Sequence, residues 1–173
     1  MKNKSIAQTN YSDWQIFSLT FLRVLIGWHF LFEGLMKLYT PGWTAKSYLE
    51  GSVGPFSSIF KALTTDPTIL MIIDNLNEWG LVIIGLGLFI GLFEKPLKLA
   101  GILLLLLYYL AYPPFPGLTI NTSMEGSYWI VNKNLVEMAA ILVLFFFPSG
   151  HITGIDSFIF KKKKKYRPDF SNN

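Results

Sequence analysis

The sequence predicts an all-α membrane protein: a polytopic four-helix bundle with a short interfacial helix in its first outer loop. The chain has 173 residues and is 51% hydrophobic, which is more apolar than a soluble domain of this length usually is. Its apolar residues gather in four runs, at residues 17–39, 76–93, 97–112 and 128–147. Each run approaches the length that a helix needs to cross a ~30 Å hydrocarbon core, the last two only just. Because open strands cannot cross lipid, we expect all four to be helices.

The distribution of basic residues predicts the orientation of such a bundle. With four crossings, ten basic residues fall on one side: Lys2, Lys4, Lys95, Lys98, Lys161 to Lys165 and Arg167. The opposite side receives Lys46, Lys61 and Lys133. An excess of lysine and arginine marks the cytoplasmic side, so both termini are expected to be cytoplasmic and the protein to lie in the cytoplasmic (inner) membrane. The lysine run is interpreted as a topology signal and lipid-headgroup anchor, not a nucleic-acid site.

The elements are expected in the following order. Residues 1–13 form a polar cytoplasmic tail, residues 14–160 the four-transmembrane-helix domain and residues 161–173 a basic cytoplasmic tail. The first helix ends at the Thr40–Pro41–Gly42 stop, and the long outer loop that follows carries helical apolar spacing over residues 56–63. That spacing predicts a short amphipathic helix at the membrane interface.

The remaining helices follow from their start and stop signals. Asp66 and Pro67 provide an N-cap and a first helical residue for the second helix. A tight cytoplasmic turn is expected at residues 94–96, followed by a nearly all-leucine third helix over 97–112 that faces lipid. Its one interior charge, Lys98, is expected to reach the headgroups. A fourth helix returns inward over residues 128–147.

The first helix carries an unusual polar stripe. At about 100° per residue, one face holds Arg23, Gly27, Phe30, Gly34 and Lys37. Glu33 lies beside this stripe, one turn before Lys37, with His29 one turn earlier still. Glutamate followed four residues later by lysine is the favourable order for a pair within one helix. The glycines allow a second backbone to approach closely, so this face is expected to point into the bundle.

Two other helices place polar residues at the same depth. Glu78 opens the second helix, and Lys133, Asn134 and Glu137 lie in the outer half of the fourth. The spacing predicts that Glu137 stacks on Lys133 and Asn134, and that three glutamates face Lys37 and Lys133. Arg23 is expected to be alone, deeper in the bundle. Ionisable groups inside a membrane are costly and usually functional.

These charges allow two interpretations. They form either clamps between helices or a pocket that binds a ligand and also needs the pairs. His29 is either a hydrogen-bonded packing residue or a proton carrier. The aromatic residues near the outer end form an interfacial belt or, alternatively, the wall of a quinone site: Tyr108, Tyr109, Tyr112, Tyr128 and Trp129.

The absence of cysteine limits the redox chemistry that the chain can provide. Without thiolates, disulfide exchange, iron–sulfur clusters and thiolate metal sites are not expected. A haem site is not expected either, because the second histidine, His151, lies beyond the inner end of the fourth helix. No metal site is expected. Redox chemistry would need a quinone, another bound cofactor or a partner protein.

The polar residues resemble a known membrane family. Between residues 22 and 37, the arginine, glycine, phenylalanine, glycine and lysine of the stripe are similar to the first helix of the DoxX/DoxD family of small four-helix membrane proteins. Glu78 with Gly85 is similar to that family's second helix, and residues 133–137 to its fourth. The resemblance covers about residues 14–160. DoxD is the small membrane subunit of a thiosulfate:quinone oxidoreductase, so the resemblance implies a quinone-linked redox context.

The function expected from these observations is that of a membrane subunit of a quinone-linked oxidoreductase acting on a small anionic, sulfur-containing donor. Lys37, helped by Lys133, would attract the anion. Glu33, Glu78 and Glu137 would hold the cations and take up quinol protons, while Arg23 would hold a helix contact or a quinone carbonyl. Catalytic residues are not assigned. Expected partners are lipids, a soluble or membrane redox subunit and a second copy of the chain. The alternative is a non-catalytic membrane partner, an assembly protein or a small-solute carrier.

Overall fold

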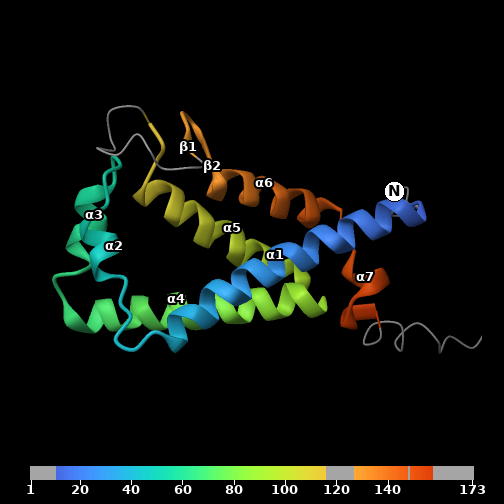
Figure 1. Ribbon diagram of the computed structural model, residues 1–173, viewed down its shortest axis with the longest axis horizontal. Helices are drawn as coiled ribbons and strands as arrows, with labels where there is room; N and C mark the ends of the chain where they lie inside the picture. The colour runs from blue at the N-terminus through green and yellow to red at the C-terminus, as the bar shows by residue number, and fades with distance from the viewer. Residues whose placement is uncertain (1–10, 116–126, 148, 158–173) are drawn as a thin grey trace, which may run out of the picture.

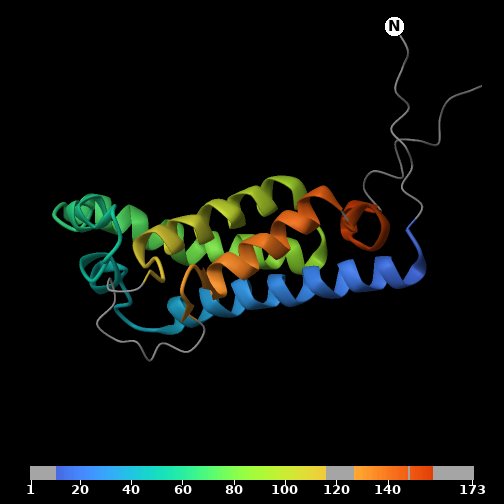
Figure 2. The ribbon, with the colours of Figure 1, turned by 90° about the horizontal axis from the view of Figure 1, so that it is seen from above.

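The computed structural model describes residues 11–115, 127–147 and 149–157, and they are almost entirely helical. The elements in chain order are α1 (Asp13–Tyr39), α2 (Lys46–Glu50), α3 (Ser57–Ala62), α4 (Pro67–Ile90), α5 (Glu94–Ala111), β1 (Ser127–Tyr128), β2 (Val131–Asn132), α6 (Lys133–Phe146) and α7 (Gly150–Thr153). Helices α1, α4, α5 and α6 lie along the long axis of the molecule (Figures 1 and 2). The predicted all-α class is confirmed.

The two ends of the molecule are built differently. Helices α2 and α3 and the β1–β2 hairpin lie at one end, and α7 lies at the other, beside the start of α1 (Figures 1 and 2). The predicted interfacial helix at 56–63 corresponds to α3, and the predicted cap of α4 is present: the Asp66 side chain accepts hydrogen bonds from the backbone N–H groups of Thr68 and Ile69. The segment after α1 also contains α2, which the sequence did not predict.

Two of the predicted boundaries were wrong. The turn between α4 and α5 lies at residues 91–93, where Gly91 and Phe93 adopt positive φ angles of 71° and 49°. Glu94 therefore belongs to the first turn of α5, where Pro96 is tolerated because no helical partner is needed for its missing N–H. The fourth apolar run begins as a hairpin, with Tyr128 opposite Val131, and α6 starts only after the Asn132 N-cap. Apolar residues in a short run do not distinguish strand from helix.

Two helices in the described ranges, α1 and α4, are long and apolar enough to cross a membrane, judged by length and composition. Helix α5 carries Glu94, Lys95 and Lys98 near its start. Helix α6 has 14 residues and spans about 21 Å at a rise of about 1.5 Å per residue. This is shorter than a ~30 Å hydrocarbon core.

The helices pack as two pairs around a shared core. The most extensive contact is between α1 and α4, and the next is between α5 and α6. The predicted glycine face makes the first contact close: a Cβ atom on Gly27 would lie 2.5 Å from the Phe89 nitrogen, and one on Gly34 would lie 2.8 Å from the Val82 nitrogen. Buried apolar residues join the two pairs: Ile26, Phe30, Leu81, Ile84, Leu88, Leu105, Ile141 and Leu144.

A buried ion-pair network joins the helices at the α7 end. Both oxygens of the Glu94 carboxylate are used: Oε1 lies 2.5 Å from Arg23 Nη1, and Oε2 lies 2.5 Å from Lys98 Nζ. Lys98 also donates to the backbone oxygen of Leu144 on α6, at 2.9 Å. The exposed fractions of Arg23, Glu94 and Lys98 are 2%, 4% and 0%. We call these three residues the Arg23 cluster.

This network corrects three expectations. Arg23 is not alone, because Glu94 reaches it from α5. Lys98 does not extend to the headgroups, because Glu94 lies one turn before it and both side chains turn into the bundle. Glu94 is a buried residue of α5 and not part of a turn as expected. The segment after α6 closes the same region, since the Asp156 N–H donates to the Gly91 oxygen at 3.1 Å and its carboxylate accepts from the Phe93 N–H at 3.3 Å.

The Arg23 cluster predicts a large effect of neutralising Glu94. In Glu94→Gln, two buried cations lose their shared counter-ion, so we expect unfolding in detergent to become easier by about 3–5 kcal/mol. The matched control is Lys95→Met on the next, exposed residue, which should change stability by less than about 0.5 kcal/mol. Thermal or denaturant unfolding followed by circular dichroism measures both. Equal midpoints for Glu94→Gln and wild type would rule out a stabilising network.

Candidate functional site

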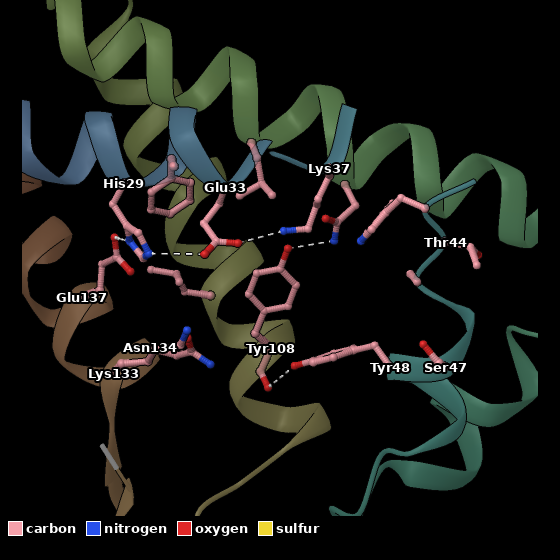
Figure 3. A pocket seen from close by; sticks show the side chains of 16 residues that line it. His29, Glu33, Lys37, Thr44, Ser47, Tyr48, Tyr108, Lys133, Asn134 and Glu137 are labelled. Carbon is pink, nitrogen blue, oxygen red and sulfur yellow. Dashed lines mark hydrogen bonds and ion pairs between the residues drawn. The ribbon is translucent and has the colours of Figure 1, made fainter. Parts of the chain in front are cut away.

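A cavity of about 340 Å³ lies between the helices near the end that carries α2 (Figure 3). Charged and aromatic side chains from α1, α2, α5, α6 and the segment between α1 and α2 line it, and α4 adds Asn77 and Leu81. Six of the eight residues that the sequence singled out line it: His29, Glu33, Lys37, Lys133, Asn134 and Glu137. Helix geometry explains the α1 members, because residues three and four apart share one face.

Arg23 and Glu78, the other two predicted residues, do not line the cavity. Arg23 lies in the buried cluster near α7. Glu78 is half-buried on α4, and it makes no ion pair or hydrogen bond with any residue of the described part of the chain. Its neighbour Asn77 lines the cavity instead. The sequence predicted how deep in the membrane Glu78 lies, but that depth does not determine which face of α4 carries its side chain.

The charged side chains form a row across one wall of the cavity (Figure 3). Glu137 Oε1 lies 2.7 Å from His29 Nδ1, His29 Nε2 lies 4.0 Å from Glu33 Oε1, and Glu33 Oε2 lies 3.1 Å from Lys37 Nζ. The predicted Glu33–Lys37 pair is thus present. His29 sits between two carboxylates, one from its own helix and one from α6.

The histidine in this row is suited to exchange protons. While Glu137 is ionised it can only accept a hydrogen bond, so His29 Nδ1 carries the proton and donates. In the neutral imidazole, Nε2 is then free to accept a proton. The His29 side chain is 45% exposed and that of Glu137 is 12% exposed, so the pair is open to the cavity from the histidine side.

The expected stacking of Glu137 on Lys133 is not observed. Glu137 pairs with His29 of α1, and Lys133 has no ion-pair partner among the residues that the structure describes. Lys133 is the first residue of α6 and is exposed, while Glu137 lies one turn deeper, where α1 is the nearer neighbour. Two lysines and two glutamates line the cavity, so their charges balance when His29 is neutral.

The other walls join Tyr108, one of the aromatic residues offered above as the wall of a quinone site, to residues that were not assigned to the site: Trp43, Tyr48 and Asn77. Asn77 Nδ2 donates to the Tyr108 hydroxyl at 2.8 Å, and the Tyr48 hydroxyl donates to the Tyr108 backbone oxygen at 3.3 Å. Trp43 covers Lys37, whose Nζ lies 5.5 Å from the ring centroid. The polar stretch of α4 that contains Asp74, Asn75, Asn77 and Glu78 was the signal that could have identified this wall.

The segment between α1 and α2 is fixed over the cavity by hydrogen bonds to the bundle. The Ala45 N–H donates to Asp74 Oδ1 of α4 at 2.8 Å. The hydroxyl of Tyr112, which caps the end of α5, donates to the backbone oxygen of Tyr48 in the adjoining α2 at 2.8 Å, and the centroids of the two rings lie 4.6 Å apart. The long first loop, which the sequence marked as unusual, therefore supplies one wall of the site.

Comparison of the chain with protein-family models, with curated proteins and with solved structures finds no match. The likeness to DoxX/DoxD stays a prediction that rests on the residues of α1, α4 and α6 named above. The chemistry of the cavity must accordingly be argued from its own side chains.

The contacts in the cavity predict which residue Glu137 is coupled to. A double-mutant cycle of His29→Leu and Glu137→Gln should give a coupling energy of about 1 kcal/mol, the size of a hydrogen bond to a partly exposed charged group. The control cycle of Lys133→Met and Glu137→Gln should give less than about 0.3 kcal/mol. Detergent unfolding midpoints provide the energies. A larger coupling for Lys133 than for His29 would contradict the observed pairing.

Proposed function

We propose that the chain is an integral membrane protein with four crossings and cytoplasmic termini, whose cavity opens toward the outer side. The exposed apolar face of α1 supports a location in the membrane. Six large apolar side chains along α1 are between 49% and 61% exposed: Phe17, Phe21, Leu25, Trp28, Phe32 and Met36. Apolar surfaces of this extent are unfavourable in water and match the hydrocarbon core of a bilayer.

The charges of α5 are compatible with a crossing. Glu94 and Lys98 are buried against Arg23 and are not directed at lipid. Intramembrane charges that pair inside a bundle are the kind that membranes tolerate. A short helix such as α6 is accommodated by local thinning of the bilayer. Lys95 in the α4–α5 region and the lysines at 161–165 then lie on the cytoplasmic side.

This topology predicts that neither end of the chain is reachable from outside the cell. Tags placed within residues 1–5 or 168–173 should resist a membrane-impermeant label in intact cells and react after permeabilisation. A cysteine introduced at Lys46, on exposed α2, should react in intact cells and serves as the positive control. Labelling of either terminus from outside would overturn the four-crossing arrangement.

Within the membrane, we infer a quinone-linked redox role for the cavity. The observation that carries this proposal is the His29–Glu137 pair facing a cavity with aromatic walls. Reduction of a quinone to a quinol takes up two electrons and two protons. His29, held by Glu137, is placed to deliver protons, and the aromatic side chains provide an apolar wall for a flat ring.

The electrons must come from a donor or from a partner subunit that oxidises it. A small anionic donor, such as a sulfur oxyanion, fits the positive side chain of Lys133, which has no ion-pair partner in the described residues. Lys37 forms an ion pair with Glu33, so it attracts the anionic donor more weakly than Lys133 does. Arg23 takes no part, because Glu94 holds it at the far end of the bundle.

A small-solute carrier is the second candidate. The observation that favours it is the balance of two lysines against two glutamates in the cavity, which suits a neutral or zwitterionic solute. A carrier would bind its solute without quinone and without electron transfer. Quinone binding therefore separates the two proposals.

The redox proposal predicts that a decyl-substituted benzoquinone stabilises the purified protein, because a ligand that prefers the native state raises its melting temperature. His29→Gln should weaken that binding about tenfold, equal to about 1.4 kcal/mol, whereas Lys37→Met should weaken the binding of thiosulfate. Lys46→Met is the matched control, since Lys46 lies on exposed α2 and its one ion-pair partner in the described residues is Glu50, at 3.9 Å. The redox proposal fails if the quinone does not shift the melting temperature, whether or not thiosulfate does.

A further inference from the structure

The Tyr108 hydroxyl donates no hydrogen bond to any residue that the structure describes. Its oxygen already accepts a hydrogen bond from Asn77 Nδ2, at 2.8 Å. A phenol has one proton to donate. Tyr108 cannot donate this proton back to Asn77 Nδ2, because that nitrogen is itself a donor. Among the residues that the structure describes, the only hydrogen bond to this hydroxyl is the one from Asn77 Nδ2, and the Asn77 Oδ1 atom is buried without a partner. The proton is therefore available to a molecule in the cavity.

Neighbouring side chains hold the Tyr108 phenol in place. The Tyr48 hydroxyl donates to the backbone oxygen of Tyr108, and the two rings meet edge to face with centroids 5.9 Å apart. Figure 3 shows the Tyr108 ring standing in the cavity, with its hydroxyl on the side of Lys37 and Glu33. A donor that is fixed before binding loses little conformational freedom when a ligand arrives.

Two other side chains in the cavity already donate to a carboxylate. Lys37 Nζ donates to Glu33 at 3.1 Å, and His29 Nδ1 is bound to Glu137 at 2.7 Å. Lys133 is available, but it carries a positive charge and suits an anion. Tyr108 is a neutral donor that stands between them in the cavity, whose lining also includes the neutral side chains of Thr44, Ser47 and Asn134. A neutral donor suits a neutral acceptor such as a carbonyl oxygen.

We propose that Tyr108 binds an acceptor oxygen of a neutral, carbonyl-bearing ring in the cavity, and that Asn77 is a positioning residue that keeps the hydroxyl proton turned toward it. This inference rests on the proposed quinone-linked function and adds to it a specific binding contact. Tyr108 holds one oxygen of the ligand, on the side of the cavity away from His29. An inorganic anion does not need this contact.

Isosteric substitutions test the contact. Tyr108→Phe removes only the hydroxyl and should weaken binding of a decyl-substituted benzoquinone about tenfold, while thiosulfate binding stays unchanged. Tyr109→Phe is the matched control, because the adjacent Tyr109 hydroxyl donates to the Ile130 backbone oxygen at 2.9 Å and does not line the cavity. Asn77→Asp should weaken quinone binding as much as Tyr108→Phe does, because a carboxylate captures the hydroxyl proton. Binding is read by calorimetry on the detergent-purified full chain.

The outcomes distinguish this inference from the function on which it rests. Quinone binding that is equal in wild type, Tyr108→Phe and Tyr109→Phe overturns the role of Tyr108 and leaves the redox proposal standing. Quinone binding that depends on Tyr108, in membranes that reduce no quinone, supports the inference and rejects the redox proposal. No quinone binding by the wild-type chain overturns both. Unchanged binding in Asn77→Asp, with loss in Tyr108→Phe, removes the positioning role from Asn77.

Discussion

The Glu94 carboxylate holds two cations and thereby ties the bundle together at one end. Its ion pair with Arg23 links α5 to α1, and its ion pair with Lys98 lies within α5 itself. Lys98 also donates a hydrogen bond to the Leu144 backbone oxygen, which extends the link to α6. Three nearly inaccessible ionised groups are stable only as a set, because each would be costly without the others. The set fixes the rotation of α1, and with it the direction in which His29, about two turns further along, points.

The way in which the helices pair explains where the cavity lies. Gly27 and Gly34 let α1 approach the backbone of α4, and α5 packs separately against α6. The apolar core joins the pairs through the middle of the bundle. Toward the α2 end the contacts between the pairs are polar side chains, and the segment carrying Trp43 and Tyr48 covers the space that they leave. The long first loop is thus part of the site and not merely a connection.

Patterns within one helix were predictable from the sequence, and contacts between helices were not. The buried face of α1, the Glu33–Lys37 pair and the Asp66 cap all follow from spacing over three or four residues. Glu94 and Lys98 also have that spacing. Their pair was not predicted because Glu94 was assigned to a turn and not to the helix. The His29–Glu137 contact joins residues 108 positions apart. No local rule gives the relative rotation of two helices, so the sequence assigned Glu137 to Lys133, its neighbour on α6.

The two groups of charges differ in burial, and this difference bears on what each one does. The Arg23 cluster is inaccessible and uses both carboxylate oxygens, as a structural clamp requires. The row from Glu137 to Lys37 is open: the His29 and Glu33 side chains are both 45% exposed to the cavity. Partly exposed ion pairs contribute little stability, typically about 0–1 kcal/mol. Stability alone is therefore a weak reason to place four ionisable groups around a cavity between apolar helices. A ligand that exchanges protons with His29 would explain why these groups surround a cavity, and a purely structural clamp would not. We therefore favour a binding site at this end of the bundle.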